Sequence, residues 1–228
     1  MNDLAQKLIE ELQCETVFTI PVLGGIPVSE AVVVTWIIMA VLVIAAFILT
    51  RNLKVNHISK RQAVAESIVT ALMNMVQGMV GEKGRKYVPY LTTVMLYIGV
   101  SNIIGLFGFK SPTKDLRVTV ALALMSIILI EAAGIYHKGV KRWLHGFVEP
   151  VAIVTPINIL EVVTKPLSLC MRLFGNVLGA FVIMELLKMI LPVGLPVVFS
   201  LYFDIFDGLL QAYVFVFLTS LYIDEITE

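Results

Sequence analysis

Ionisable and amide side chains lie within two long apolar stretches near the C-terminus, in surroundings that normally exclude them. The first stretch carries Asn158, Glu161, Lys165, Arg172, Asn176, Glu185 and Lys188, and the second carries Asp204, Asp207 and Gln211. Placing an arginine or an aspartate at the centre of a membrane helix costs about 2.5–3.5 kcal/mol on insertion scales. We therefore expect these side chains to face protein or water instead of lipid, where they could bind and release a small cation.

Helical spacing places the polar residues of the first stretch on two faces. At about 100° per residue, Glu161 and Arg172 lie about 20° apart, and Asn176 lies about 40° from Arg172. Glu185 and Lys188 fall on roughly the opposite side of the helix. Two polar faces that are separated by the body of one helix suit two aqueous routes that do not join.

The polar residues of the second stretch form a single set. Asp204, Asp207 and Gln211 follow an i, i+3, i+7 pattern, so they share one helix face. Asp207 could also be solvated in the outer half of its helix without any role in transport. Two further structural alternatives are ion pairs along the first helix, Glu185–Lys188 and Glu161–Lys165.

Arg172 differs from the other charged residues because apolar residues flank it on both sides, well inside the stretch. Arginine stays protonated at any accessible pH, so it cannot relay protons but can hold a permanent positive charge. An ionisable residue in this position is predicted to be functional. Gly175 and Gly179 follow it with the small-xxx-small spacing that lets another helix approach closely.

Hydropathy predicts the elements that position these residues. The chain has 228 residues, of which 58% are hydrophobic and only 15% are charged, whereas soluble domains average about 45–50% and 25%. A spanning helix needs about 20 mostly apolar residues. We expect one membrane domain over 29–228, all-α and polytopic, with an amphipathic surface helix at about 60–81. About five spans are predicted, the last two long enough for a strong tilt, at 29–50, 88–109, 116–136, 157–191 and 195–222.

Basic residues predict the orientation in the membrane. Lysines and arginines are concentrated after the first and third predicted spans, within 51–86 and 137–145. Because such segments remain in the cytoplasm, the N-terminus is expected outside and the C-terminus inside. Residues 1–28 would then form an N-terminal segment outside the cell, including a short surface helix. One loop opposes this orientation by placing three basic residues outside, Lys110, Lys114 and Arg117.

Several stretches resemble one known family. The run KPLSLCMRLFGN at 165–176 is similar to the signature of subunit a of the F-type ATP synthase. Supporting stretches occur in family order, and they are SNIIGLF at 101–107, TVALAL at 119–124, PINILE at 156–161 and LQAYVFVFLT at 210–219. The resemblance covers the chain from about residue 90 to the C-terminus.

The resemblance implies a subunit of the bacterial cell membrane that is not itself an enzyme and that binds no nucleotide, cofactor, metal or nucleic acid. In that family, subunit a supplies two offset half-channels for a proton or a sodium ion beside a rotating c-subunit ring. Its other partners are the b subunit stalk and the rest of the complex. The family's essential arginine falls on Arg172, its neighbouring asparagine on Asn176, its last-helix glutamine on Gln211, and its glutamate before the Lys-Pro pair on Glu161. We expect Asn176 and Gln211 to hydrogen-bond Arg172 or to hold water beside it.

The sequence departs from the family at one pair of positions. Many members carry a Glu/His pair there, but this chain has Phe181 and Asp204. Glu185 lies one turn after Phe181, about 40° round the helix. Glu185 is therefore a candidate for the same access route, together with Asp204 and Asp207.

Two other classes of membrane protein remain as alternatives. An ion-coupled secondary transporter, unrelated to ATP synthesis, typically has broken helices at matching positions in both halves, but Pro166 has no counterpart in the first half. An intramembrane enzyme needs a nucleophile with a base, or a metal cluster, within its spans. His57, His137 and His145 instead lie in the predicted cytoplasmic segments.

Overall fold

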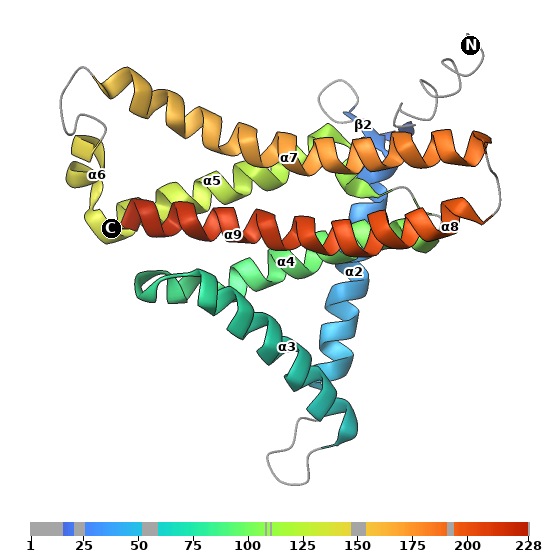
Figure 1. Ribbon diagram of the computed structural model, residues 1–228. Coiled ribbons are helices and arrows are strands. Elements are labelled where there is room, and N and C mark those ends of the chain that lie inside the picture. Colours follow the sequence, from blue (N-terminus) through green and yellow to red (C-terminus); the bar gives the residue numbers. More distant parts are fainter. Residues whose placement is uncertain are drawn as a thin grey trace.

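The computed structural model describes residues 16–20, 26–51, 59–107, 109, 111–146, 154–190 and 194–227. The surface helix expected near the N-terminus precedes residue 16 and lies outside these ranges. The described chain is almost entirely helical, with one short hairpin at its start (Figure 1).

Five helices of the described chain are long and apolar enough to cross a membrane, by length and composition. This confirms the all-helical class with five candidate spans. They are α2 (Glu30–Thr50), α4 (Val88–Ile103) with its flanking 3-10 turns, α5 (Leu116–Lys138), α7 (Thr155–Ile190) and the continuous run from α8 to α9. The turns beside α4 are η1 (Glu82–Tyr87) and η2 (Ile104–Phe107), and η3 (Pro112–Lys114) precedes α5. Two further helices are α3 (Lys60–Met79) and α6 (Val140–Gly146).

A two-stranded hairpin precedes α2. Its strands β1 (Thr16–Ile20) and β2 (Ile26–Ser29) pair antiparallel. Two strands alone are marginally stable in water, but here Val28 and Ser29 are buried where β2 runs into α2. The hairpin was not predicted, because apolar runs of five and four residues are too short to distinguish a strand from a helix by their pattern.

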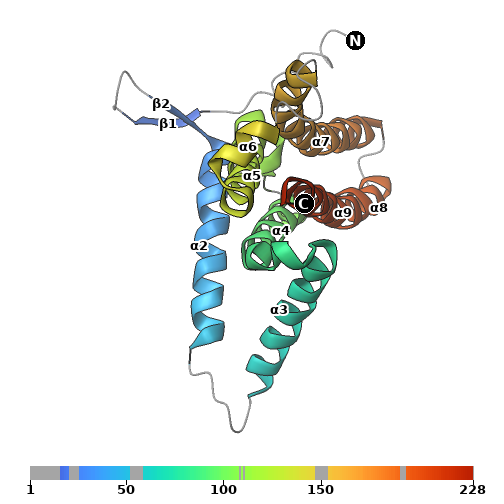
Figure 2. The same cartoon turned by 90° about the vertical axis from the view of Figure 1, so that its left-hand side faces the viewer.

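The long helices pack into one bundle. Helices α4, α5, α7 and α9 run in a similar direction, and α2 crosses that direction (Figure 1). In the view turned by 90°, α2 and α3 extend beyond the other helices on the lower side (Figure 2). Helices α4, α5, α7 and α9 each bury large apolar side chains against the others. Examples that are at most 1% exposed are Ile98 of α4, Ile130 of α5, Leu173 of α7 and Phe215 of α9. These contacts fix which faces of α7 and α9 turn inward.

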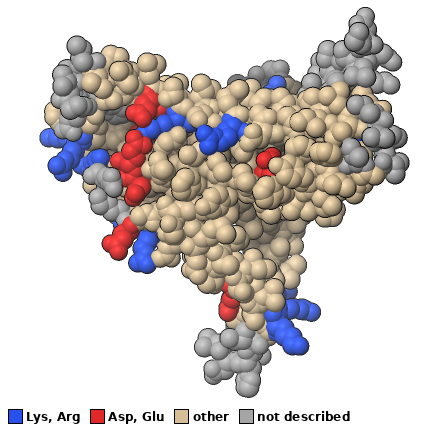
Figure 3. Space-filling view, viewed as in Figure 1, with Lys and Arg blue, Asp and Glu red and all other residues tan. Residues whose placement is uncertain are grey.

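The outer surface is largely apolar. On α2, Val43 and Phe47 are each about two-thirds exposed, at 68% and 66%. In the space-filling view, charged atoms gather at the end near the C-terminus and at the lower tip, while most of the face over α7 and α9 is uncharged (Figure 3). Apolar side chains are compatible with hydrocarbon. The backbone is compatible with it too, because helices satisfy their own hydrogen bonds.

The last helix changes its pitch where it carries its two aspartates. Helix α8 (Leu195–Ser200) leads into η5 (Leu201–Asp207), a π-helix, which continues as α9 (Gly208–Thr227). A π-helical segment is rare and often accompanies a functional site. Pro166, in contrast, lies inside α7 without ending it.

Buried hydrogen bonds tie the ends of several helices together. Asn102, near the end of α4, donates through Nδ2 to the carbonyl oxygen of Gly208 at 3.0 Å and accepts at Oδ1 from Thr113 Oγ1 at 2.8 Å. Ser29 Oγ donates to Asp115 Oδ2 at 2.8 Å. The starts of α2 and α5, the end of α4 and the start of α9 therefore meet at one end of the bundle.

We predict that Asn102→Ala destabilises the protein, because it leaves the buried Gly208 carbonyl and Thr113 hydroxyl each without one partner. An unsatisfied buried polar group costs about 1–3 kcal/mol, which lowers the melting temperature by about 2–4 °C per kcal/mol in a chain of this length. Thermal unfolding of the purified complex in detergent measures this. Thr93→Ala on the same helix is the control, since the Thr93 hydroxyl is exposed and bonds only within α4. Equal melting temperatures for the two variants would contradict the role of Asn102.

Candidate functional site

Arg172 lies on an outward face of α7. Leu169, Cys170 and Leu173 are buried on the inward side, whereas Arg172 is exposed. Among the residues that the structure describes, the Arg172 guanidinium has no hydrogen-bond or ion-pair partner. Its permanent charge is therefore free to act on something outside this chain.

The same face of α7 is open beyond the arginine. Gly175 and Gly179 are exposed, and a β-carbon at either position would meet no described atom within 4 Å. Asn176 is also exposed, and its Nδ2 donates to Gln211 Oε1 of α9 at 2.7 Å. The open face thus combines a cation, two glycines and an amide that joins α7 to α9.

Asn176 and Gln211 do come together, but not around Arg172. Neither amide hydrogen-bonds the guanidinium among the described residues, and the two bond to each other; that they hold water beside Arg172 stays a prediction. Gln211 is 2% exposed, and its Nε2 finds no acceptor among the described residues. Their register is set by the packing of α7 against α9, which spacing within one helix does not predict.

A cavity of about 560 Å³ lies between α7, the end of α4 and the last helix. Asp204, Asp207 and Gln211 all line it, so the face predicted from their spacing is brought to one place. Glu185 and Phe181 line it from α7. Within the described part of the chain, Asp204 and Asp207 take part in no ion pair.

Glu185 is already paired. Lys188 Nζ donates to Glu185 Oε1 at 2.7 Å, which is the i, i+3 structural alternative. The side chain of Glu185 is 18% exposed and that of Lys188 is 53% exposed, so the pair lies where the cavity opens outward. The net charge that this pair contributes to the cavity is therefore close to zero.

Lys114 is a site residue that the sequence did not indicate. It was assigned to an outer loop, but its side chain is buried at 7% exposure and lines the cavity. Its Nζ lies 3.2 Å from the centre of the Phe181 ring, a cation–π contact. No local spacing relates Lys114 to Phe181, because the contact depends on η3 folding back against α7.

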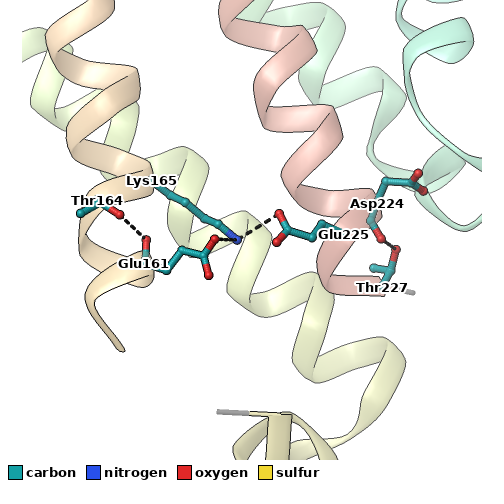
Figure 4. A network of polar contacts seen from close by, with 6 residues as sticks. All are labelled: Glu161, Thr164, Lys165, Asp224, Glu225 and Thr227. Carbon is teal, nitrogen blue, oxygen red and sulfur yellow. Dashed lines mark hydrogen bonds and ion pairs between the residues drawn. The ribbon is translucent and has the colours of Figure 1, made fainter. Parts of the chain in front are cut away.

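A second group of charges joins the opposite ends of α7 and α9 (Figure 4). Lys165 Nζ donates to Glu225 Oε2 at 3.1 Å and lies 3.8 Å from Glu161 Oε1. The same ammonium lies 5.2 Å from the centre of the Tyr222 ring. The expected Glu161–Lys165 pair is present, whereas Glu225 was not among the predicted site residues because it follows the last predicted span.

The charges are thus arranged in order along α7. Lys165 precedes Arg172 by seven residues and Glu185 follows it by thirteen, which is about 10 Å and about 20 Å at 1.5 Å per residue. Arg172 lies between a charged group at one end and a carboxylate-lined cavity at the other.

This fold and site define a polytopic membrane protein with a central exposed cation and a separate acidic cavity. The sequence profile of the family described as "ATP synthase A chain" matches residues 32–224. The chain belongs to the ATP synthase subunit a family, and it is a multi-pass membrane subunit of the ATP synthase complex.

Individual relatives agree over most of the chain. The ATP synthase subunit a of Moorella thermoacetica is 36% identical over 203 residues, covering 88% of this chain and 92% of the relative. "ATP synthase subunit a, sodium ion specific" of Propionigenium modestum is 34% identical over 215 residues, covering 87% and 74%. "ATP synthase subunit a 1" of Crocosphaera subtropica is 30% identical over 200 residues, covering 87% and 86%. The membership decides against the secondary transporter and the intramembrane enzyme.

We predict that cysteines at positions 176 and 211 can be joined by a short thiol cross-linker, because the two native side chains meet at 2.7 Å. Cys14 and Cys170 are first replaced by alanine, and mass spectrometry of linked peptides detects the product. The control pair is Val163→Cys with Gln211→Cys, since Val163 is exposed and lies about 20 Å from Asn176 along α7. Equal yields for both pairs would contradict this packing of α7 on α9.

Proposed function

We propose that this subunit carries a proton or a sodium ion across the membrane through two offset half-channels that meet a c-subunit ring. The cavity at Asp204 is the outer half-channel, and the inner one lies near Glu161 and Lys165. Arg172 lies on α7 between the two. The observation that supports this most strongly is the exposed guanidinium, without a partner among the described residues, on an open glycine-lined face.

An N-terminus outside and a C-terminus in the bacterial cytoplasm fit the contacts at the two ends. The Ser29–Asp115 bond brings the starts of α2 and α5 together at the end that also carries the cavity. Lys165 and Glu225 bring the start of α7 and the end of α9 together at the other end. The basic segment after α5 lies at this second end, which the positive-inside rule assigns to the cytoplasm.

The mechanism follows from the cost of charge in lipid. A ring carboxylate in hydrocarbon is tolerable when a cation neutralises it and costly when bare. Beside Arg172 the bare form is favoured, because the opposite charge stabilises the ionised carboxylate. The ion therefore leaves just before the carboxylate meets Arg172, and another binds just after. Each charge that falls through 100 mV releases about 2.3 kcal/mol, which drives rotation of the ring.

Asp204 and Asp207 are better suited than Glu185 to pass the ion along the outer half-channel. Glu185 is neutralised by Lys188 at 2.7 Å, whereas neither aspartate has an ion-pair partner among the described residues. A carboxylate without a counter-ion attracts a cation more strongly than a paired one. Glu185 lines the cavity but is not needed to bind the ion.

We predict that Arg172→Ala abolishes ATP-driven ion pumping in inverted vesicles that contain the whole complex. Without the guanidinium, nothing expels the ion from the ring carboxylate or separates the two half-channels. Arg142→Ala is the control, because Arg142 is an exposed arginine on α6, away from the cavity. Pumping and ATP synthesis at the wild-type rate in Arg172→Ala would refute the proposed function.

We also predict that Asp204→Asn slows ATP-driven pumping by about tenfold or more, and that Glu185→Gln slows it by less than about threefold. A general acid or base that transfers a proton typically contributes a factor of about 10²–10⁴. Of these two carboxylates, only Glu185 forms a close salt bridge within the described residues, so Asp204 is the better candidate for ion transfer. Rates are compared at equal amounts of assembled complex. A larger loss in Glu185→Gln than in Asp204→Asn would reverse the assignment of the two carboxylates.

A further inference from the structure

Gly105 lies in the turn η2 and directly faces the carboxylate of Asp204. A β-carbon at position 105 would lie 3.0 Å from Asp204 Oδ1 and 3.3 Å from Asp204 Cγ. Both distances are shorter than ordinary van der Waals contact, so a methyl group at position 105 would require the carboxylate to shift by a few tenths of an ångström. Gly105 and Asp204 both line the cavity.

The backbone at position 105 does not itself require glycine. Among the described glycines, only Gly139 and Gly194 have a positive φ, the conformation that favours glycine over other residues. Gly105 instead lies in a helical turn, where alanine is preferred by about 1 kcal/mol. Space for the Asp204 carboxylate is therefore the structural reason for a glycine here.

The surrounding contacts prevent the two segments from moving apart. Asn102, one turn before Gly105, donates to the carbonyl oxygen of Gly208 at 3.0 Å. A β-carbon at Gly208 would lie 2.8 Å from Asn102 Cβ, so the end of α4 and the start of α9 are in close contact. If position 105 carried a methyl group, the carboxylate of Asp204 would be the part that shifts by a few tenths of an ångström, because the backbone beside it is held.

We propose that Gly105 is a positioning residue for ion translocation, because the space left by its missing side chain seats the Asp204 carboxylate in the access route. This proposal rests on the proposed function of the cavity. It assigns to the end of α4 a part in transport that belongs neither to Arg172 nor to any charged residue. A residue at position 105 with a side chain leaves the fold intact but moves the ion-handling oxygen atoms.

The test compares Gly105→Ala with Gly99→Ala in the complete ATP synthase. Gly99 is a matched control on α4, since it is buried and a β-carbon there would lie 3.6 Å from Leu209 Cδ2, an ordinary contact. Displacing a reacting group by about 1 Å can reduce a rate about 100-fold, so the smaller shift of a few tenths of an ångström at Asp204 is expected to reduce it less. We expect ATP-driven pumping to fall about tenfold in Gly105→Ala and less than about twofold in Gly99→Ala. Equal rates in the two variants would overturn the proposal.

A second variant separates positioning from a merely structural effect. Gly105→Asp combined with Asp204→Ala moves the carboxylate across the contact, so that it projects into nearly the same space. We expect this pair to pump several-fold faster than Asp204→Ala alone, and no recovery would overturn the proposal. If Gly105→Ala does not assemble into the complex, the comparison of the double variant with Asp204→Ala alone tests the proposal. If Asp204→Asn pumps at the wild-type rate, the proposal that the cavity is a half-channel is wrong. If Asp204→Asn is impaired while Gly105→Ala is normal, only the proposed role of Gly105 is wrong.

Discussion

A permanent positive charge on the outward face of α7 is the constraint on which the rest of this structure depends. A guanidinium cannot lose its proton to escape an apolar environment, so it needs water, an anion or a partner protein. Rotation of α7 cannot hide it inside the chain, because Leu169, Cys170 and Leu173 already occupy the inward face of this helix. Thr119 and Cys170 are in contact at 3.5 Å and hold α5 against that inner face. The packing of the bundle thus keeps Arg172 facing outward.

The other charges of α7 are handled differently from Arg172. Lys165 is balanced by Glu225 and Glu161, and Glu185 by Lys188. Each of these groups lies toward an end of the helix, where the low-dielectric cost is smallest. The charges near both ends of α7 are thus paired, whereas Arg172 near its centre has no partner in the described chain. An anionic group that approaches this face is therefore attracted mainly to Arg172. This arrangement is consistent with the proposed function, in which a moving ring carboxylate passes Arg172.

Hydropathy and spacing predicted much of the fold and part of the site, and the failures have a common physical origin. The five apolar helices and the shared face of Asp204, Asp207 and Gln211 are properties of single helices, which a sequence records directly. The burial of Lys114 against Phe181 and the Asn176–Gln211 bond depend on how distant segments pack. Neither contact leaves a local pattern. The charge of Lys114 also gave no hint of its burial, since lysine is rarely buried.

The acidic face of the last helix begins in a π-helix, which the sequence did not predict. The expected i, i+3, i+7 pattern assumed about 100° per residue, whereas η5 forms wider turns with i→i+5 hydrogen bonds. Asp204 lies in this π-helical segment, and its carboxylate faces Gly105 just after the end of α4. The segment returns to α-helical pitch at Gly208, the residue whose carbonyl Asn102 holds. The π-helix, the glycine and the asparagine are therefore parts of one local arrangement that sets the position of the carboxylate.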